Sequence, residues 1–464
     1  MHFSIPDMQE VKDDNGSSYV AYNIHINGSF HCTVRYKQMH SLHEQLRKEY
    51  GPNTLPCFPP KKLLPLTPAQ TEERRALLEK YVQLVSQDSR VASDDLFNGF
   101  LLNAQQETLN AKEEEVDMDI YLMNWQKVSI HVMSIDPTSL VLEAVAKAIN
   151  LQFDLICYFC IYLINKKDNE IIVKRQLQDF EAPYLSLQAA GAGHYLIIRK
   201  SYWDLSYDDD LLDDRTALNL LYVQAISDVE RGWTITTKET QQQLAALQAK
   251  GSKKEYLQLA RTLKYYGYIQ FQPCKSDFPQ QNSKVIVSAG GRELSFRVQI
   301  ASGLIKEINF RVTRIRCWRI TTSISDKSKD SDDGSDMLKL ELSFEYLVNK
   351  DKLQWITITS EQAIMMSMCL QGMVDELLVK KTGSKFRCQP ERTRRGSWSY
   401  MKRDGSSHQL CVSRSVSSDS IVHGTNDKLS GLSLKSPTRS GNGSASPKTF
   451  VENDAFEGIG DEDL

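Results

Sequence analysis

The stretch that decides the fold is FHCTVRY, residues 30–36, a β-rich run that ends on an arginine and a tyrosine. Asn27-Gly28 separates this run from a second β-rich run at 18–26, and that dipeptide between two such runs is typical of a hairpin turn. From residue 36 to about residue 50, apolar side chains recur at helical spacing. We therefore expect two paired strands that lead directly into a helix, with Arg35-Tyr36 at the junction.

Four side chains around this junction are suited to hold one phosphorylated ring. The guanidinium of Arg35 can fork onto a phosphate, and Tyr36 can lie under a sugar ring. Lys61 follows a pair of prolines, and Arg74 lies on a second helix that begins near residue 68, so both can supply further cations. Arg75 competes with Arg74 for this role, and a lone Arg-Arg pair is more often a solvated helix face.

The loop between Lys61 and the second helix carries apolar side chains. Such residues either pack within the loop or, beside a phosphate site, enter the interface of a lipid bilayer. Insertion would add about 25 cal/mol per Å² of buried apolar surface to the affinity for a single headgroup. The candidates for membrane insertion are Leu63, Leu64 and Leu66.

The composition limits the class of protein. The 464 residues, 25% charged and 41% hydrophobic, suffice for three or four modest soluble domains. Because the net charge is -3, bulk attraction to nucleic acid is not supported, and we expect no nucleic-acid partner. No apolar run approaches the roughly 20 residues of a membrane helix, and the N-terminus lacks the layout of a signal peptide. We therefore expect a cytoplasmic protein.

The sequence contains no recognisable catalytic or metal-binding motif. There is no Gly-rich phosphate loop followed by Lys-Ser/Thr, no Gly-x-Ser-x-Gly and no His-Glu-x-x-His. The close cysteine pair, Cys157 and Cys160, lies in a predicted buried strand at 155–163, where residues three apart face opposite sides. We expect no enzymatic activity, no cofactor and no metal.

After a polar linker at 103–115, the periodicity changes three times. Two strands, a helix and further strands extend to about residue 200, which is the order of a ubiquitin-like domain. Residues 215–267 are helical, and the acidic run 208–210 before them lacks the spacing of a calcium loop, which predicts a solvated connection. From residue 284 strands return, and one helix closes the block near residue 380. The predicted fold class is α+β with several domains.

Residues 1–108 resemble the phox-homology (PX) domain. The resemblance rests on Arg35-Tyr36 at a strand end, on the proline-rich turn that closes on Lys61, and on Arg74 four residues before Leu78. It implies binding of phosphatidylinositol 3-phosphate, with Arg35 on the 3-phosphate and Tyr36 stacked on inositol. Lys61 would contact the 1-phosphate and Arg74 the ring hydroxyls. Many relatives have a small hydroxyl residue at the position of Lys37, so the contact that Lys37 makes stays open.

The next three blocks resemble a FERM module, and a PX domain directly before such a module resembles the PX-FERM group of sorting nexins. Similar segments include 201–204, 231–233, 316–319 and the last nine residues. The resemblance implies five parts: a PX domain at 1–108, a ubiquitin-like F1 lobe at 115–204, a helical F2 lobe at 205–270, a phosphotyrosine-binding-type (PTB-like) F3 lobe at 271–381, and a disordered tail at 382–464.

PTB-like lobes bind extended peptides by strand addition beside their C-terminal helix. Trp318 alternates in phase with Arg314 and Arg316, which favours the open face, although a tryptophan that covers the end of the sandwich is equally compatible. Val374 and Leu378 are four apart and share a helix face. The resemblance implies that Trp318, Val374 and Leu378 line a groove for Asn-Pro-x-Tyr or Asn-Pro-x-Phe motifs. Such motifs would belong to receptors such as LDL-receptor-family proteins, β integrins, P-selectin and amyloid precursor protein.

The tail from 382 to 450 is rich in Ser, Gly, Lys and Arg with little periodicity, which predicts disorder. Asn453 and Phe456 have the Asn-x-x-Phe spacing of the cargo motif, so this segment is a candidate pseudo-ligand for the groove. The end of the chain is either a solubilising acidic tail or a docking peptide. The resemblance implies that it docks on the retriever recycling complex through Asp461, Glu462, Asp463 and Leu464.

Together, these features predict a non-enzymatic adaptor that lies peripherally on early endosome membranes. It would bind receptor tails and direct them to recycling instead of lysosomal degradation. The alternative is a FERM-type linker between membrane and cytoskeleton, or a signalling scaffold. A linker of that kind would need an actin-binding tail, whereas this tail ends in an acidic apolar peptide.

Overall fold

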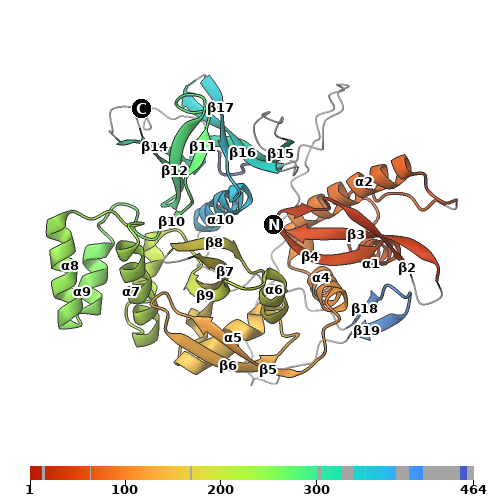
Figure 1. Ribbon diagram of the computed structural model, residues 1–464, viewed down its shortest axis with the longest axis horizontal. Coiled ribbons are helices and arrows are strands. Elements are labelled where there is room, and N and C mark those ends of the chain that lie inside the picture. The colour runs from red at the N-terminus through yellow and green to blue at the C-terminus, as the bar shows by residue number, and fades with distance from the viewer. Residues whose placement is uncertain are drawn as a thin grey trace, which may run out of the picture.

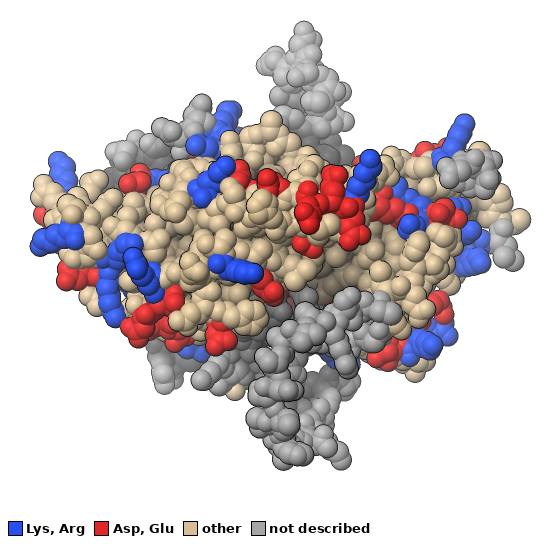
Figure 2. Space-filling model, turned by 90° about the horizontal axis from the view of Figure 1, so that it is seen from below, with Lys and Arg blue, Asp and Glu red and all other residues tan. Residues whose placement is uncertain are grey.

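The computed structural model describes residues 1–12, 16–62, 64–167, 170–299, 305–324, 338–350, 352–382, 397–410 and 450–456. A PX-like domain and three lobes in the order of a FERM module lie side by side (Figure 1). Within the described ranges, no helix is long and apolar enough to cross a membrane. Acidic and basic side chains are interspersed on the face shown in Figure 2, in keeping with the small net charge.

The first domain is a four-stranded antiparallel sheet covered by helices. The strand β3 (Ser18–Ile26) pairs with β1 (Phe3–Ser4), β2 (Met8–Lys12) and β4 (Ser29–Arg35). Asn27 and Gly28 both have positive φ in the turn between β3 and β4, as the hairpin prediction requires. The predicted helices are confirmed as α1 (Tyr36–Tyr50) and α2 (Pro68–Gln87), and they are followed by α3 (Ser89–Ala92) and α4 (Asp95–Thr108).

The F1 lobe is a mixed five-stranded sheet in the order β6-β5-β9-β7-β8, with the parallel central pair β5 and β9 of a ubiquitin-like fold. The predicted strand at 155–163 is only partly correct, because residues 153–158 form a 3-10 helix before β7 begins at Phe159. The elements are β5 (Glu115–Tyr121), β6 (Lys127–Met133), α5 (Thr138–Ile149), η1 (Phe153–Tyr158), β7 (Phe159–Lys167), β8 (Glu170–Gln176), α6 (Pro183–Ala190) and β9 (His194–Lys200).

The PX domain packs directly on the F1 lobe. Phe180 of F1 belongs to the PX core, and its ring centroid lies 5.9 Å from that of the buried His31. The side-chain amide of Gln105 on α4 accepts a hydrogen bond from the backbone N–H of Ala182 at 2.9 Å and donates one to Ser186 at 3.0 Å. The linker at 103–115 is therefore not a free hinge, since α4 itself carries the contact.

The F2 lobe is joined to F1 by a buried polar cluster. Asp208 has no exposed surface and accepts hydrogen bonds from Lys200, Tyr202 and Tyr266. The prediction that 208–210 is a solvated connection is wrong for Asp208, because its carboxylate is the shared acceptor of three buried donors. The elements of this lobe are η2 (Leu205–Asp210), α7 (Arg215–Glu230), α8 (Lys238–Lys250) and α9 (Lys253–Ala260).

The F3 lobe is a strand-rich sandwich closed by one long helix, α10 (Ala363–Lys381). Its sheet runs in the order β14-β13-β12-β11-β17-β16-β15-β20, and β10 pairs with β12. The strands are β10 (Ile269–Gln270), β11 (Cys274–Ser276), β12 (Ser283–Gly290), β13 (Glu293–Gln299), β14 (Ile305–Arg311), β15 (Ile315–Ile324), β16 (Leu338–Asn349) and β17 (Lys352–Thr359), with η3 (Val312–Arg314) before β15.

Two segments of the tail contradict the prediction of disorder. The strands β18 (Trp398–Met401) and β19 (Ser407–Leu410) form a hairpin, drawn in blue beside the PX domain in Figure 1. The strand β20 (Phe450–Glu452) joins the edge of the F3 sheet next to β15. The composition of the tail did not reveal these two segments because each is short and is stabilised by contacts with another domain.

Candidate lipid and peptide sites

Arg35 ends β4, and its side chain is held on two sides. Its Cζ lies 4.1 Å from the centroid of the Tyr19 ring, which is a cation–π distance. Its Nη1 donates to the backbone carbonyl of Arg403 in the tail hairpin at 3.1 Å. The backbone N–H of Arg35 donates to Oε1 of Gln38 at 2.8 Å, which caps the start of α1. The strand-to-helix junction therefore fixes both the backbone and the side chain of Arg35.

Tyr36 and Arg74, two of the residues of the predicted lipid site, contact each other. The Cζ of Arg74 lies 4.3 Å from the centroid of the Tyr36 ring, and its Nη2 is 3.4 Å from the carbonyl of Pro60. The Tyr36 hydroxyl donates to the carbonyl of Pro59 at 2.8 Å. The proline pair is thus bound to the junction by both side chains, which places the start of the Lys61 loop beside them.

The choice between Arg74 and Arg75 follows from their packing. Arg75 forms ion pairs with Glu72 at 2.6 Å and Glu79 at 3.5 Å, and it donates to the carbonyl of Ile5. The hydrogen bonds that Arg75 donates to the Glu72 carboxylate raise the pKa of Arg75 above its ordinary value. Arg75 therefore fixes the N-terminal strand to α2, whereas Arg74 is on the Tyr36 side of the helix.

The other residues of the predicted lipid site lie at the surface. Lys37 and Lys61 are both exposed. Leu64 is 80% exposed and Leu66 is half-buried. Leu63 lies outside the described residues.

Trp318 is not on the open face, so that interpretation is wrong. Its side chain is fully buried, and its indole N–H donates to Ser367 on α10 at 2.9 Å. A register shift between Ile315 and Cys317 reverses the alternation predicted from the sequence. Trp318 consequently lies opposite the buried Phe344 and faces the core beneath α10.

Val374 and Leu378 share one face of α10 as expected, but their exposure differs. Val374 is 2% exposed and belongs to the core, whereas Leu378 is partly buried against the same cluster. Val451 and Ala455 of the tail belong to this cluster too.

The tail segment 450–456 occupies the edge of the F3 sheet as an added strand. β20 pairs antiparallel with β15, with Val451 opposite Trp318. The side-chain amide of Asn453 donates to the carbonyls of Val312 at 2.8 Å and Ile315 at 2.6 Å. The backbone N–H of Phe456 donates to the carbonyl of Asn453 at 3.0 Å, which closes a turn. Asn453 and Phe456 are thus placed together by the Asn-x-x-Phe spacing.

The hairpin at 397–410 escaped prediction, although the sequence carried a signal for it. Trp398 and Tyr400 alternate with polar residues, and Asp404-Gly405 follows, which is a strong hairpin dipeptide. The residues that bind this hairpin, Gln38 and Glu107, carried no such signal because each is a common helix residue. The predicted docking peptide at Asp461, Glu462, Asp463 and Leu464 lies outside the described residues.

Known proteins resemble this chain in the same domain order. The family model of the PX domain matches residues 22–104. The family model of the F1 lobe of sorting nexins 17, 27 and 31 matches residues 116–203, and that of the F2 lobe of sorting nexins 17 and 31 matches residues 204–264. The model of the Sorting Nexin 17 FERM C-terminal domain matches 267–378.

Full-length relatives extend the likeness along the entire chain. The chain is 49% identical to sorting nexin-17 of Danio rerio and 50% identical to sorting nexin-17 of Homo sapiens, in both cases over all of each chain. It is 38% identical to sorting nexin-31 of Homo sapiens, over 84% of this chain and 89% of that one. PX domains bind phosphoinositides and PTB-like lobes bind peptide motifs, and neither is a catalytic domain.

Proposed function

Because this chain belongs to the PX-FERM sorting nexin family, we propose that it is a non-enzymatic adaptor that holds receptor tails on endosomes and passes them to recycling. The observation that carries the proposal is the added strand β20. A segment with Asn-x-x-Phe spacing pairs with the β15 edge beside α10, which is the mode by which PTB-like lobes take extended peptides. Calorimetry with Asn-Pro-x-Tyr peptides tests it directly.

The PX domain selects the membrane in this proposal. Arg35 binds the 3-phosphate of phosphatidylinositol 3-phosphate, Tyr36 stacks on inositol, and Lys61 binds the 1-phosphate. Arg74 takes the ring hydroxyls, which its position over Tyr36 supports. The exposed Lys37 adds a cation next to the junction. Leu64, together with Leu63 and Leu66, enters the bilayer interface, and the 80% exposure of Leu64 supports this role.

The F3 lobe selects the cargo. Asn-Pro-x-Tyr and Asn-Pro-x-Phe motifs of receptors such as LDL-receptor-family proteins, β integrins, P-selectin and amyloid precursor protein add a strand to β15. Leu378 supplies the partly exposed apolar surface for the motif. Val374 and the buried Trp318 support that surface from the core, the latter through its hydrogen bond to Ser367.

The tail segment 450–456 competes with cargo for the same edge. A tethered segment has an effective concentration in the millimolar range, so even a weak pseudo-ligand occupies the groove. Deletion of 450–456 is expected to raise the affinity for a receptor-tail peptide about tenfold. Calorimetry on the two full-length forms measures the change.

A point variant makes this test more specific. Asn453→Ala removes the two side-chain hydrogen bonds that join the tail segment to F3, together with one inside the segment to Ala455, and should also raise the affinity for peptide. Glu452→Gln changes an exposed side chain of the same strand and should leave the affinity at the wild-type value. Equal peptide affinity for the wild type and the 450–456 deletion would reject self-occupancy.

The end of the chain supplies the connection to recycling. We propose that Asp461, Glu462, Asp463 and the terminal Leu464 dock on the retriever complex. Removal of Leu464 alone should abolish recovery of retriever in a pull-down and leave liposome binding unchanged. The 450–456 deletion keeps the terminal peptide and is the matched control. Retained retriever in the variant that lacks Leu464 would contradict this role.

The alternative is a FERM-type linker between membrane and cytoskeleton, or a signalling scaffold. Binding of peptide arrays that carry Asn-Pro-x-Tyr tails, compared with actin co-sedimentation, separates the two. Sedimentation with actin in the absence of peptide binding would favour the linker.

A further inference from the structure

The tail hairpin 397–410 packs on α1 and α4 of the PX domain through the aromatic side chains of Tyr400 and Trp398. Tyr400 is 2% exposed, and its ring centroid lies 5.8 Å from that of Phe100. Trp398 lies over Gly99, where an added Cβ would come within 2.1 Å of a ring carbon of Trp398. The absence of a side chain at position 99 therefore gives Trp398 its place on α4.

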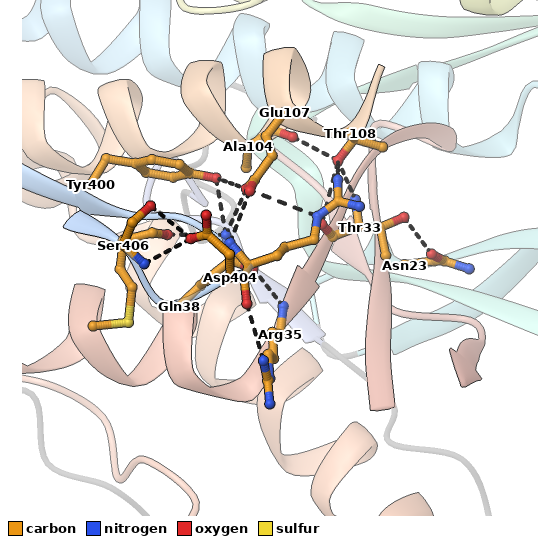
Figure 3. Close-up of polar contacts among 12 residues, drawn as sticks. Asn23, Thr33, Arg35, Gln38, Ala104, Glu107, Thr108, Tyr400, Asp404 and Ser406 are labelled. Carbon is orange, nitrogen blue, oxygen red and sulfur yellow. Dashed lines mark hydrogen bonds and ion pairs between the residues drawn. The ribbon is translucent and has the colours of Figure 1, made fainter. Parts of the chain in front are cut away.

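Polar groups fix the orientation of the docked hairpin. The side-chain amide of Gln45 donates to the carbonyl of Ser399 at 2.8 Å and accepts from its N–H at 3.0 Å. The Tyr400 hydroxyl donates to Glu107 at 2.8 Å and accepts from Gln38 at 3.1 Å. Gln38, Glu107 and Tyr400 point toward one another in Figure 3. The Gln38 amide nitrogen has three acceptors, Glu107 at 2.9 Å and, in the hairpin, the Tyr400 hydroxyl and the Met401 carbonyl, both at 3.1 Å. Loss of the hairpin would remove two of the three.

The same contacts reach Arg35. The Arg403 carbonyl accepts from Nη1 of Arg35 at 3.1 Å, and Gln38, which binds the hairpin with its amide nitrogen, caps the Arg35 backbone with its oxygen. The guanidinium of Arg403 itself turns away, since it donates to Thr108 at 2.8 Å and lies beside Glu107. The hairpin therefore offers Arg35 an acceptor, while the charge of Arg403 is directed to α4.

We propose that the hairpin 397–410 is a part of the phosphoinositide site that positions the Arg35 guanidinium for the 3-phosphate. This inference rests on the proposed binding of phosphatidylinositol 3-phosphate by the PX domain. A free arginine side chain loses rotamer freedom when it binds a phosphate. With Tyr19 under its plane and the Arg403 carbonyl at one N–H, Arg35 is already ordered before lipid arrives. One hydrogen bond of this kind corresponds to an affinity change of about threefold to tenfold.

Positioning of this kind makes lipid binding and hairpin docking mutually dependent. Coupling between two binding events is reciprocal, so a headgroup on Arg35 must stabilise the docked hairpin by the same factor. A hairpin that only stabilises the PX fold would lack this response to lipid. Binding of headgroup to the full chain should therefore slow hydrogen exchange at residues 398–401.

Two full-length variants test the proposal with short-chain phosphatidylinositol 3-phosphate in calorimetry. Deletion of 397–410 removes the positioning element. Gly99→Ala places a methyl group in the space of the Trp398 ring, and alanine is the better helix former, so α4 should persist. We expect both variants to bind about threefold to tenfold more weakly than the wild type. In Gly99→Ala, exchange at 398–401 should also increase.

Controls separate this inference from the proposed function. His408→Ala alters an exposed residue of β19 and should bind as the wild type does. Short-chain phosphatidylinositol, which lacks the 3-phosphate, should bind weakly to every form. Equal or higher affinity of the 397–410 deletion for the 3-phosphate lipid would overturn the positioning role. Failure of the wild type to bind that lipid would instead reject the proposed lipid function, and the inference with it.

Discussion

Arg35→Ala should reduce the affinity of the full chain for phosphatidylinositol 3-phosphate liposomes by about 100-fold, which corresponds to about 2.7 kcal/mol. The guanidinium of Arg35 is able to fork onto the phosphate, and charge-assisted bidentate bonds are the strong ones. Arg35→Lys keeps the charge without the fork and should recover only part of the affinity. Liposome co-sedimentation over a lipid titration provides the measurement.

The matched control for this change is Arg47→Ala. Arg47 lies near the far end of α1 and is half-exposed beside Glu44, so the substitution removes the same charge away from the junction. The two variants should have the same melting midpoint and differ in lipid affinity. If both variants lost lipid affinity equally, the loss of one positive charge would be the cause, and not the loss of the bidentate hydrogen bonds from Arg35.

Leu378→Asp should lower binding of Asn-Pro-x-Tyr peptides by more than about 100-fold, because a carboxylate in an apolar pocket must be desolvated without a partner. Leu378 is a sharper test than Val374. Val374 is 2% exposed, so a charge there would disturb the core and not only the groove. Calorimetry in the background of the 450–456 deletion removes competition from the tail.

The neighbouring Val379 supplies the control for Leu378. It lines a cavity shared with Met1 and Trp203, between α10 and the other domains, and Val379→Asp introduces the same charge on that different side of the helix. Both variants should bind phosphatidylinositol 3-phosphate liposomes as the wild type does. Retained peptide binding by a folded Leu378→Asp protein would contradict the role of this side chain.

Short sequence patterns predicted the PX domain well because its turn and its helix start are determined by residues that are neighbours in the sequence. Asn27-Gly28 required a tight turn, and the apolar stripe after Tyr36 required a helix that buries Met39, Leu42 and Leu46. The sequence did not decide between Arg74 and Arg75, since adjacent helix positions differ by about 100° and only the packing of Ile5 against α2 assigns them.

The surroundings of the candidate peptide site were harder to predict, for a physical reason in each case. A single register shift beside Arg316 reversed the faces of β15, and strand alternation carries no trace of such a bulge. The folded tail segments obtain their stability from distant partners. Tyr400 of the hairpin is 293 residues from Glu107 in sequence, so no local window contains both partners of the hydrogen bond between them.

The strand β20 also protects the F3 sheet from unwanted association. An uncovered edge strand presents unpaired N–H and C=O groups to any other extended chain, which makes it a site for aggregation. With residues 450–452 paired on residues 317–319 of β15, this part of the edge is covered by the molecule itself. On the proposed function, a cargo peptide that replaced them would exchange one set of backbone hydrogen bonds for an equivalent set. Recognition would then depend on the side chains, and this part of the edge would be paired both before and after the exchange.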